Sequence, residues 1–334
     1  MRVLIALGGN AMTAPDGRAR PEDQIAAVTA AMQPVADLVT AGVEVVLTHG
    51  NGPQVGNLLV KNELAAAVVP PVPLDWCVAQ TQGTIGLILI DALEYALAAR
   101  GTARQVATLV TRTRVSADDP AMLRPTKPIG RYLPHDEALP LIEHGQVWED
   151  RGKRGWRRVV ASPEPLEILD AAAVCALVDA GLVVVANGGG GIPVVREADG
   201  SLRGVEAVID KDLGAAVLAQ AVGAEILVIA TDVPQAMLGY DTPEARPVGQ
   251  VDVATMRRYA EDGHFGSGSM GPKVEAACRF VEAGGHRAVI TSVNQIAAAV
   301  DDAIGTTVVP TPAAPSSHDH DIHDANREVG PTHA

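Results

Sequence analysis

Three runs of apolar, largely β-branched residues in this chain stop abruptly at clusters of glycine and asparagine. The runs cover 3–7, 43–48 and 182–186, and the clusters that follow them include Gly8-Gly9-Asn10, Gly50-Asn51-Gly52 and Gly188–Gly191. Each has the form of a buried strand that ends in a loop of bare backbone. We interpret the missing side chains as room for a ligand close to the main chain, whose N–H groups hold anions well.

Strand-like runs alternate with helix-like runs through most of the chain. Strands are expected at 2–7, 43–48, 105–110, 182–187, 225–230, 287–291 and 306–309, and a hairpin at 192–205. Helices are expected from Pro21 and Pro53 onward and at 76–100, 166–179, 212–222, 252–261, 272–284 and 293–301. This alternation predicts an α/β fold, a three-layer αβα sandwich with a mostly parallel central sheet. Strand ends of such a sheet share one crevice, where we expect a small anion to bind.

The alternation fails between 118 and 162, a segment we call the arm. It is rich in proline, and ten of the chain's 26 Lys and Arg residues lie between 112 and 158, against seven acids. This positive charge is either an ordinary solvated surface or a means of bringing cations to an anionic ligand. We expect one domain over 1–310, with the arm as a small protruding subdomain. The His- and Asp-rich tail, 311–334, has no periodicity and is expected to be disordered.

Charge and composition exclude several classes of protein. The net charge of −14 argues against a nucleic-acid partner. No apolar run reaches the ~20 residues of a membrane span, and Met1 and Arg2 lead directly into a strand instead of a signal peptide. Three scattered cysteines predict neither a disulfide framework nor a zinc site. We therefore expect a cytoplasmic protein with no bound metal of its own.

Lysine is scarce, with five residues against 21 arginines. Lys127, Lys211 and Lys273 stand beside prolines, glycines or a strand end, and together they suggest compact charges around a phosphoryl group. Taken singly, each lysine is better explained as a solvated side chain. Asp212 either is one of two surface acids beside Lys211 or orients neighbouring lysines, since like charges ~4 Å apart repel by roughly 4 kcal/mol at a dielectric near 20. These features favour phosphoryl transfer, which needs positioning and charge neutralisation above all.

The motifs in this sequence resemble those of the carbamate kinases, within the amino acid kinase superfamily. The resemblance covers residues 1 to about 309 and rests on ALGGNA (6–11), THGNGPQVGN (48–57), TQGTIG (81–86), PTKPIG (125–130), GWRRVV (155–160), GGGGIPVV (188–195), GVEAVIDKD (204–212) and GSMGPK (268–273). It implies a homodimer that interconverts carbamoyl phosphate plus MgADP with carbamate plus MgATP.

The resemblance also implies roles for particular residues. Gly8, Gly9, Asn10, Gly50, Asn51 and Gly52 would hold carbamoyl phosphate. Lys127 would reach the transferred phosphoryl group from the arm, Lys211 and Lys273 would stabilise it from the nucleotide side, and Asp212 would organise the lysines. Tyr240 and Met270 would line the nucleotide pocket. Carbamate is already anionic, so no general base is required and His49 is expected to be structural.

Two alternatives to this function are weighed. Another amino acid kinase, acting on a different acyl phosphate such as that of acetylglutamate, would be expected to lack the lysine-bearing arm. A non-catalytic sensor of carbamoyl phosphate or nucleotide would be expected to lack Lys211, Asp212 or Lys273. The pathway stays open, because arginine breakdown, allantoin breakdown and supply of carbamoyl phosphate look alike in this sequence.

Overall fold

A large, mostly parallel sheet forms the centre of the protein. The computed structural model describes residues 1–12, 20–266, 269–301 and 304–312. The eight strands of this sheet follow the order β15-β17-β16-β12-β1-β2-β9-β3. They are β1 (Arg2–Leu7), β2 (Glu44–His49), β3 (Val106–Thr108), β9 (Val183–Val185), β12 (Ile226–Thr231), β15 (Gln250–Asp252), β16 (Arg287–Ser292) and β17 (Thr306–Val309). All neighbours run parallel except β16 and β17. The predicted mostly parallel sheet is confirmed.

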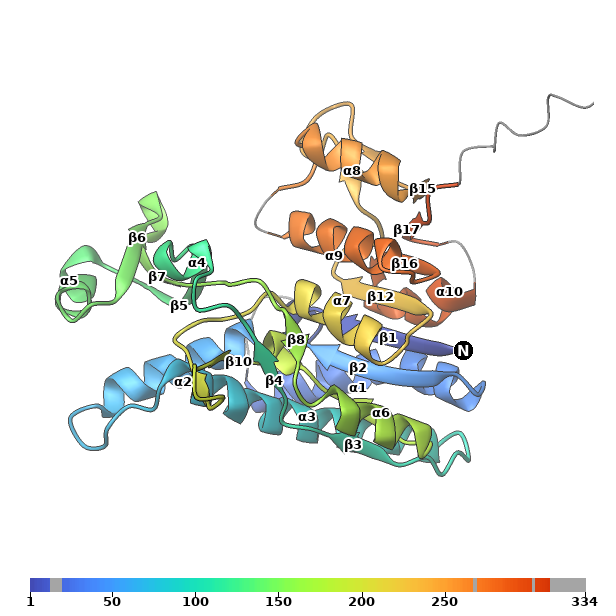
Figure 1. The fold of residues 1–334 in the computed structure, drawn as a ribbon, viewed down its shortest axis with the longest axis horizontal. Helices are drawn as coiled ribbons and strands as arrows, with labels where there is room; N and C mark the ends of the chain where they lie inside the picture. Colours follow the sequence, from blue (N-terminus) through green and yellow to red (C-terminus); the bar gives the residue numbers. More distant parts are fainter. Residues whose placement is uncertain (13–19, 267–268, 302–303, 313–334) are drawn as a thin grey trace, which may run out of the picture.

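Helices cover both faces of this sheet (Figure 1). On one face lie α1 (Pro21–Thr40), α3 (Leu74–Ala98) and α10 (Ile296–Asp301); on the other lie α6 (Ala171–Asp179), α7 (Lys211–Ala221), α8 (Val253–Glu261) and α9 (Met270–Glu282). Strand β1 shows how the sequence specifies this: Val3 and Ile5 pack against the first set, and Leu4 against the second. Because successive strand residues point to opposite faces, a continuous apolar run requires two covering layers.

Among the described residues, one helix, α3, is long and apolar enough by length and composition to cross a membrane. Half of the residues in its most apolar 18-residue segment are nevertheless buried inside the fold. Leu89 and Leu93 are fully buried in the core between α3, α1 and the sheet. The apolar character of α3 is therefore largely that of a core helix.

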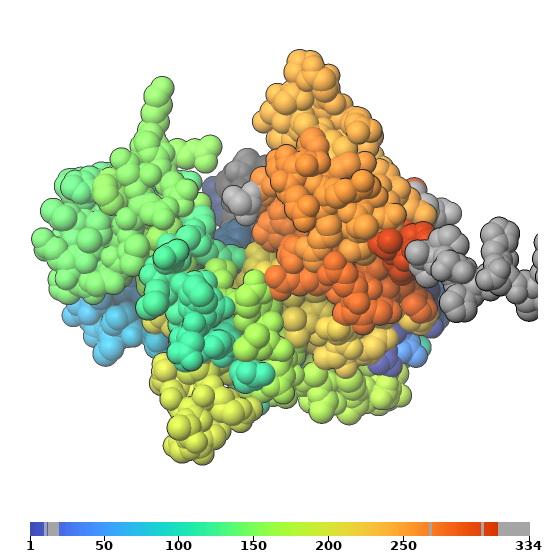
Figure 2. Space-filling model, turned by 45° about the horizontal axis from the view of Figure 1, so that its top comes forward, coloured from blue at the N-terminus to red at the C-terminus, as the bar shows by residue number. Residues whose placement is uncertain are grey.

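The arm carries a sheet of its own. It contains α4 (Pro120–Leu123), β5 (Lys127–Leu133), α5 (His135–Glu143), β6 (Val147–Asp150), η2 (Gly152–Arg154) and β7 (Trp156–Val160), with antiparallel strands in the order β5-β7-β6. One face of this sheet packs Leu133, Trp148 and Trp156 beneath α5. Figure 2 shows the arm and the region around α8 as two projections on either side of a hollow.

Shorter elements connect the arm to the central sheet. A four-stranded sheet has the order β11-β10-β4-β8, and the predicted hairpin at 192–205 is its antiparallel pair β10–β11. Its strands are β4 (Arg112–Arg114), β8 (Glu167–Ile168), β10 (Ile192–Arg196) and β11 (Leu202–Gly204), while α2 (Gly52–Ala65) lies beside the arm. The remaining elements are η1 (Gly9–Met12), η3 (Gly188–Gly190), η4 (Val293–Gln295), β13 (Met237–Leu238) and β14 (Arg246–Pro247).

The helix expected at 166–179 is wrong in its first turn. Residues Glu167–Ile168 form β8, paired antiparallel with β4, and α6 begins only at Ala171. The Asp170 carboxylate accepts a hydrogen bond from the backbone N–H of Arg112 at 2.7 Å and so joins the start of α6 to β4. Pairing with a distant strand outweighed the local helical pattern.

Candidate active site

Helix α7 begins at the sequence Asp210-Lys211-Asp212. Asp210 is its N-cap, and its Oδ1 atom accepts hydrogen bonds from the backbone N–H groups of Asp212 at 2.9 Å and Leu213 at 3.4 Å. Such caps are strongly preferred because they satisfy free donors of the first turn. The cap fixes where the helix starts, and thereby fixes the two side chains that follow it.

Asp212 bridges two lysines. Its Oδ1 lies 2.7 Å from Nζ of Lys211, and its Oδ2 accepts a hydrogen bond of 2.9 Å from Nζ of Lys273 in the first turn of α9. Asp212 is only 4% exposed. Burial alone would raise the pKa of Asp212, but the two ammonium groups outweigh it and lower the pKa to about 2. The carboxylate is therefore charged near neutral pH and permits two cations to share one buried site.

Lys211 also reaches the end of β1. Its Nζ lies 3.5 Å from the backbone oxygen of Ala6, the residue before Leu7 and the Gly8-Gly9 loop. Burial lowers the pKa of Lys211, and Asp212 opposes that shift. The fold thus gathers Lys211, Asp212 and Lys273 at the carboxyl edge of the central sheet, where α/β proteins bind their ligands.

Lys127 is held by a different carboxylate. Its Nζ, at the start of β5, donates a hydrogen bond of 2.9 Å to Oδ2 of Asp210. The cap of α7 therefore also connects that helix to the arm. No role was predicted for Asp210 from the sequence, although its position one residue before Lys211 was an available signal. Asp210 therefore pairs with Lys127, whereas Asp212 pairs with Lys211 and Lys273.

The first two strand-end loops pack directly against each other and against β12. The backbone N–H of Gly8 donates to Ala230 O and that of Gly50 to Leu7 O, both at 2.9 Å. A Cβ at Gly50 would stand 3.0 Å from the backbone N of Gly9, a tight contact that favours glycine there. In contrast, a Cβ at Gly52 would meet nothing within 4 Å. Gly52, at the start of α2, borders open space.

The glycines of the third loop, Gly188–Gly191, are explained by packing inside the protein and not by the predicted space for a ligand. A Cβ on Gly188 would stand 2.3 Å from Nε2 of His49, and a Cβ on Gly189 equally close to Nδ2 of Asn51. The side chains absent from 188–191 make room for other loops of the protein itself, so the interpretation of these glycines as a bare ligand cradle is corrected. Gly189 also has φ of 67°, which favours glycine.

His49 is fully enclosed by this packing. Its Nδ1 lies 2.8 Å from Gly50 O, and burial together with the nearby charge of Lys211 lowers its pKa to about 4. The imidazole is therefore neutral near pH 7. Enclosed and neutral, His49 matches the structural role expected from the sequence.

Of the asparagines, Asn51 is buried, and its Nδ2 donates a hydrogen bond of 2.9 Å to Oγ1 of Thr81 in α3. Asn10 belongs to η1, and its side chain lies outside what the structure describes. Tyr240, in the turn after β13, is 69% exposed. Met270 opens α9 three residues before Lys273 and packs against the apolar core. The two expected nucleotide residues thus have unlike surroundings.

A buried polar network, to which the sequence analysis gave no role, supports the third loop. Asn187 has φ of 56°, and its Oδ1 accepts a hydrogen bond of 2.9 Å from Thr113 Oγ1. Gln82 donates to Gly188 O at 3.0 Å and accepts from the backbone N–H of Thr111 at 2.8 Å. The signal was present, because Gln82 stands in the motif TQGTIG. These contacts hold α3, β4 and the loop in one arrangement.

Comparison with known proteins agrees with this geometry. The sequence model of the amino acid kinase family matches residues 1–292. The chain is 47% identical to a carbamate kinase of Thermococcus kodakarensis and 44% identical to one of Pyrococcus furiosus, in each case over 92% of this chain and 99% of the relative. A solved carbamate kinase of Giardia lamblia, bound to AMP-PNP, superposes with a TM-score of 0.88 at 39% identity, over 93% of this chain and 98% of that one.

Proposed function

The chain belongs to the amino acid kinase family, and on that premise we propose that it is a carbamate kinase, which interconverts carbamoyl phosphate plus ADP with carbamate plus ATP. The observation that carries this function is the pair of lysines on Asp212 at the carboxyl edge of the sheet. Near-full-length identity of 44–47% to carbamate kinases supports the same reaction.

Carbamoyl phosphate would bind where the β1 and β2 loops meet. Gly8 and Gly9 lie beside Gly50 there, and Gly52 borders open space at the start of α2. Backbone N–H groups at a helix N-terminus favour an anion. We assign the substrate to these glycines, with Asn51 and Asn10 completing the loops.

The lysines would stabilise the transferred phosphoryl group. In the direction of ATP formation, an oxygen of the ADP β-phosphate attacks phosphorus, and the bond from phosphorus to the carbamate oxygen breaks. Lys211 and Lys273 neutralise charge from the side of Asp212, and Lys127 approaches from the arm. Preorganised charges of this kind supply most of the catalysis in phosphoryl transfer.

This reaction needs no side chain as a general acid or base. The leaving group is carbamate, which departs as an anion and carries away the bonding electron pair. His49 is enclosed, with its Nδ1 against Gly50 O, and its pKa of about 4 keeps it neutral. Its contribution is to fill the space beneath the third loop.

We propose that Mg²⁺ accompanies the nucleotide and is held chiefly by phosphate oxygens and water. The carboxylates nearest the lysines are already engaged, Asp212 by Lys211 and Lys273, and Asp210 by Lys127 and the α7 backbone. Mg²⁺ commonly binds through substrate phosphates while keeping several waters, so this arrangement fits it. When bound, it supplies further charge neutralisation. We place the nucleotide near Met270, at the start of α9, and Tyr240, in the turn after β13.

The family resemblance and α3 together support a homodimer. About half of α3 is buried, but Trp76, Leu87 and Tyr95 are 60%, 57% and 72% exposed. Their spacing places them on one side of the helix, a pattern suited to a partner surface. Cys77 and Cys278 are buried free thiols, which fits the reducing cytoplasm where we place the enzyme.

A coupled assay for ATP formation tests the proposed reaction. ADP is supplied with carbamoyl phosphate, and in parallel with acetyl phosphate or acetylglutamyl phosphate. We expect turnover with carbamoyl phosphate to exceed the others by at least an order of magnitude. Faster turnover with another acyl phosphate would identify a different amino acid kinase, and binding without turnover of any of them would identify a sensor.

A further inference from the structure

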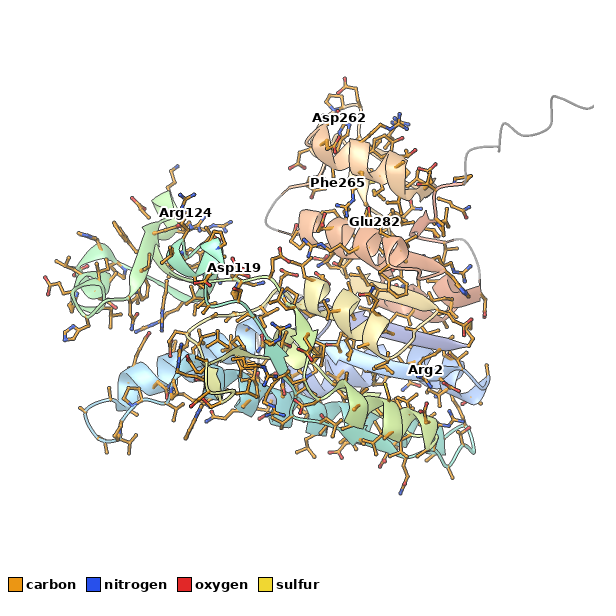
Figure 3. The ribbon with its side chains drawn as sticks, viewed as in Figure 1. Arg2, Asp119, Arg124, Asp262, Phe265 and Glu282 are labelled. Carbon is orange, nitrogen blue, oxygen red and sulfur yellow. The ribbon has the colours of Figure 1, made fainter. Side chains whose placement is uncertain are left out.

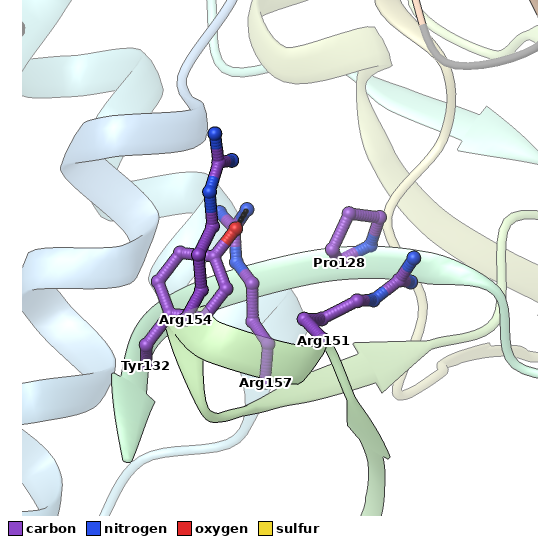
Figure 4. A pocket seen from close by; sticks show the side chains of 5 residues that line it. All are labelled: Pro128, Tyr132, Arg151, Arg154 and Arg157. Carbon is purple, nitrogen blue, oxygen red and sulfur yellow. Dashed lines mark hydrogen bonds between the residues drawn. The ribbon is translucent and has the colours of Figure 1, made fainter.

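The arm contains a pocket lined by three arginines that the proposed reaction does not use. Arg151, Arg154 and Arg157 surround it together with Tyr132 and Pro128, and its volume is about 300 Å³. Figure 4 shows Arg154 and Arg157 beside the Tyr132 ring, with Arg151 and Pro128 across the pocket. Three guanidinium groups converge here in a protein whose net charge is −14.

The strand pattern explains why these side chains meet. Trp156 and Leu133 form a pair between β7 and β5, and both pack beneath α5. Arg157 and Tyr132 are their immediate neighbours and form the next pair, so they point to the opposite face of the small sheet. Arg151 and Arg154 come from the connection between β6 and β7. The pocket is thus fixed by the sheet on one side.

The positive charge of the pocket is only partly compensated. Arg151 pairs with Glu149. Within the part of the chain that the structure describes, no carboxylate pairs with Arg154 or Arg157; both instead contact the hydroxyl of Tyr132, which they hold at a lowered pKa. Arg157 is further positioned by a hydrogen bond of 3.2 Å to Gly130 O and by stacking 5.0 Å from the Tyr132 ring centroid. Arg157 is therefore held in place, and both guanidinium groups line the pocket without a carboxylate partner among the described residues.

We propose that this pocket is a binding site for a phosphate-class oxyanion, separate from the lysines on Asp212. Guanidinium groups bind phosphate through charge-assisted hydrogen bonds, and three of them line this pocket. Pro128 of the pocket directly follows Lys127 in β5. An anion bound in this pocket would therefore contact β5 next to Lys127, the lysine that donates a hydrogen bond to Asp210. The site goes beyond the proposed function, because it takes no part in the transfer itself.

Calorimetric titration of the full chain with inorganic phosphate tests the site. Lys211→Ala provides the background, since it weakens binding at the catalytic lysines while leaving Asp212 paired with Lys273. We expect phosphate to bind this background variant, and Arg154→Gln with Arg157→Gln to weaken binding tenfold or more. Arg154→Gln alone should have a smaller effect in the same direction; because Arg154 is exposed, this variant remains informative if the double variant does not fold.

Arg124→Gln is the matched control, because Arg124 is an exposed arginine of the arm that does not line the pocket (Figure 3). Unchanged phosphate binding in the pocket variants, or equal weakening by Arg124→Gln, would overturn the proposal. Titrations with carbamoyl phosphate and ADP separate the sources: weakening of ADP as well assigns the pocket to nucleotide phosphates, and weakening of the small anions alone assigns it to them. ATP formation by the pocket variants with Lys211 intact tests the proposed reaction independently.

Discussion

Lys127 of the arm and Asp210 at the start of α7 are joined by a hydrogen bond of 2.9 Å, although 83 residues separate them in the chain. The same carboxylate caps the helix that carries Lys211 and Asp212. The arm and the catalytic lysines are therefore coupled through one side chain. That coupling motivates the first of five predictions.

Lys127→Ala should lower kcat/KM for carbamoyl phosphate by two or more orders of magnitude, because it removes one preorganised charge. Lys153→Ala is the matched control, since Lys153 is an exposed lysine of the same arm. The coupled ATP assay measures both. Equal kinetics in the two variants would mean that Lys127 has only a structural role.

Lys211→Ala and Lys273→Ala should each reduce kcat at least a hundredfold while leaving the fold intact, because Asp212 keeps one partner in either variant. Lys61→Ala, at an exposed position of α2, should behave as the unsubstituted protein. Circular dichroism and the coupled assay provide the two measurements. Near-normal turnover in both variants would remove these lysines from the mechanism.

Asp212→Asn should destabilise the protein by about 3–5 kcal/mol, since two enclosed ammonium groups would lose the carboxylate between them. Glu167→Gln breaks an exposed pair with Arg114 and should cost less than about 1 kcal/mol. Urea unfolding gives both free energies. Similar small losses for the two substitutions would show that Asp212 does not organise the lysines.

Gly50→Ala and Gly52→Ala should have opposite consequences. The added Cβ at Gly50 meets the backbone N of Gly9 at 3.0 Å, so its midpoint of thermal unfolding should fall by several degrees. The added Cβ at Gly52 meets no protein atom, so stability should be retained while KM for carbamoyl phosphate rises severalfold. An unchanged KM for Gly52→Ala would mean that the substrate does not use this space.

Protonation of His49 should destabilise the fold below pH 6.5. Its pKa is about 4 in the folded protein and near 6.5 when unfolded, so the unfolded state binds more protons between these values. Stability is then complete above pH 6.5 and declines as the pH falls towards 4. Urea unfolding at pH 7 and pH 5 should show a smaller loss for His49→Gln than for the unsubstituted protein. Identical pH dependence would mean that the pKa of His49 is the same in the folded and unfolded states.

Much of the fold follows from local patterns. The strands β1 and β17 have the predicted bounds, and β2 and β12 differ by one residue, because continuous apolar runs of strand length between turns admit few alternatives. The strand β4 went unpredicted: its sequence is Arg-Thr-Arg, and it is a strand only because β8 and β10 pair with it. Pairing partners distant in sequence leave no local trace.

By itself, the sequence determined the α/β architecture, the three lysines worth attention and the resemblance to carbamate kinases. Only the tertiary structure decided that Asp212 holds Lys211 and Lys273 while Asp210 holds Lys127, and that the glycines of 188–191 yield room to His49 and Asn51. The physical reason is that periodicity and motifs reflect interactions between residues that are close in the sequence. Charge pairing and steric exclusion depend instead on distances between atoms of remote segments, which exist only once the sheet has brought its strand ends together.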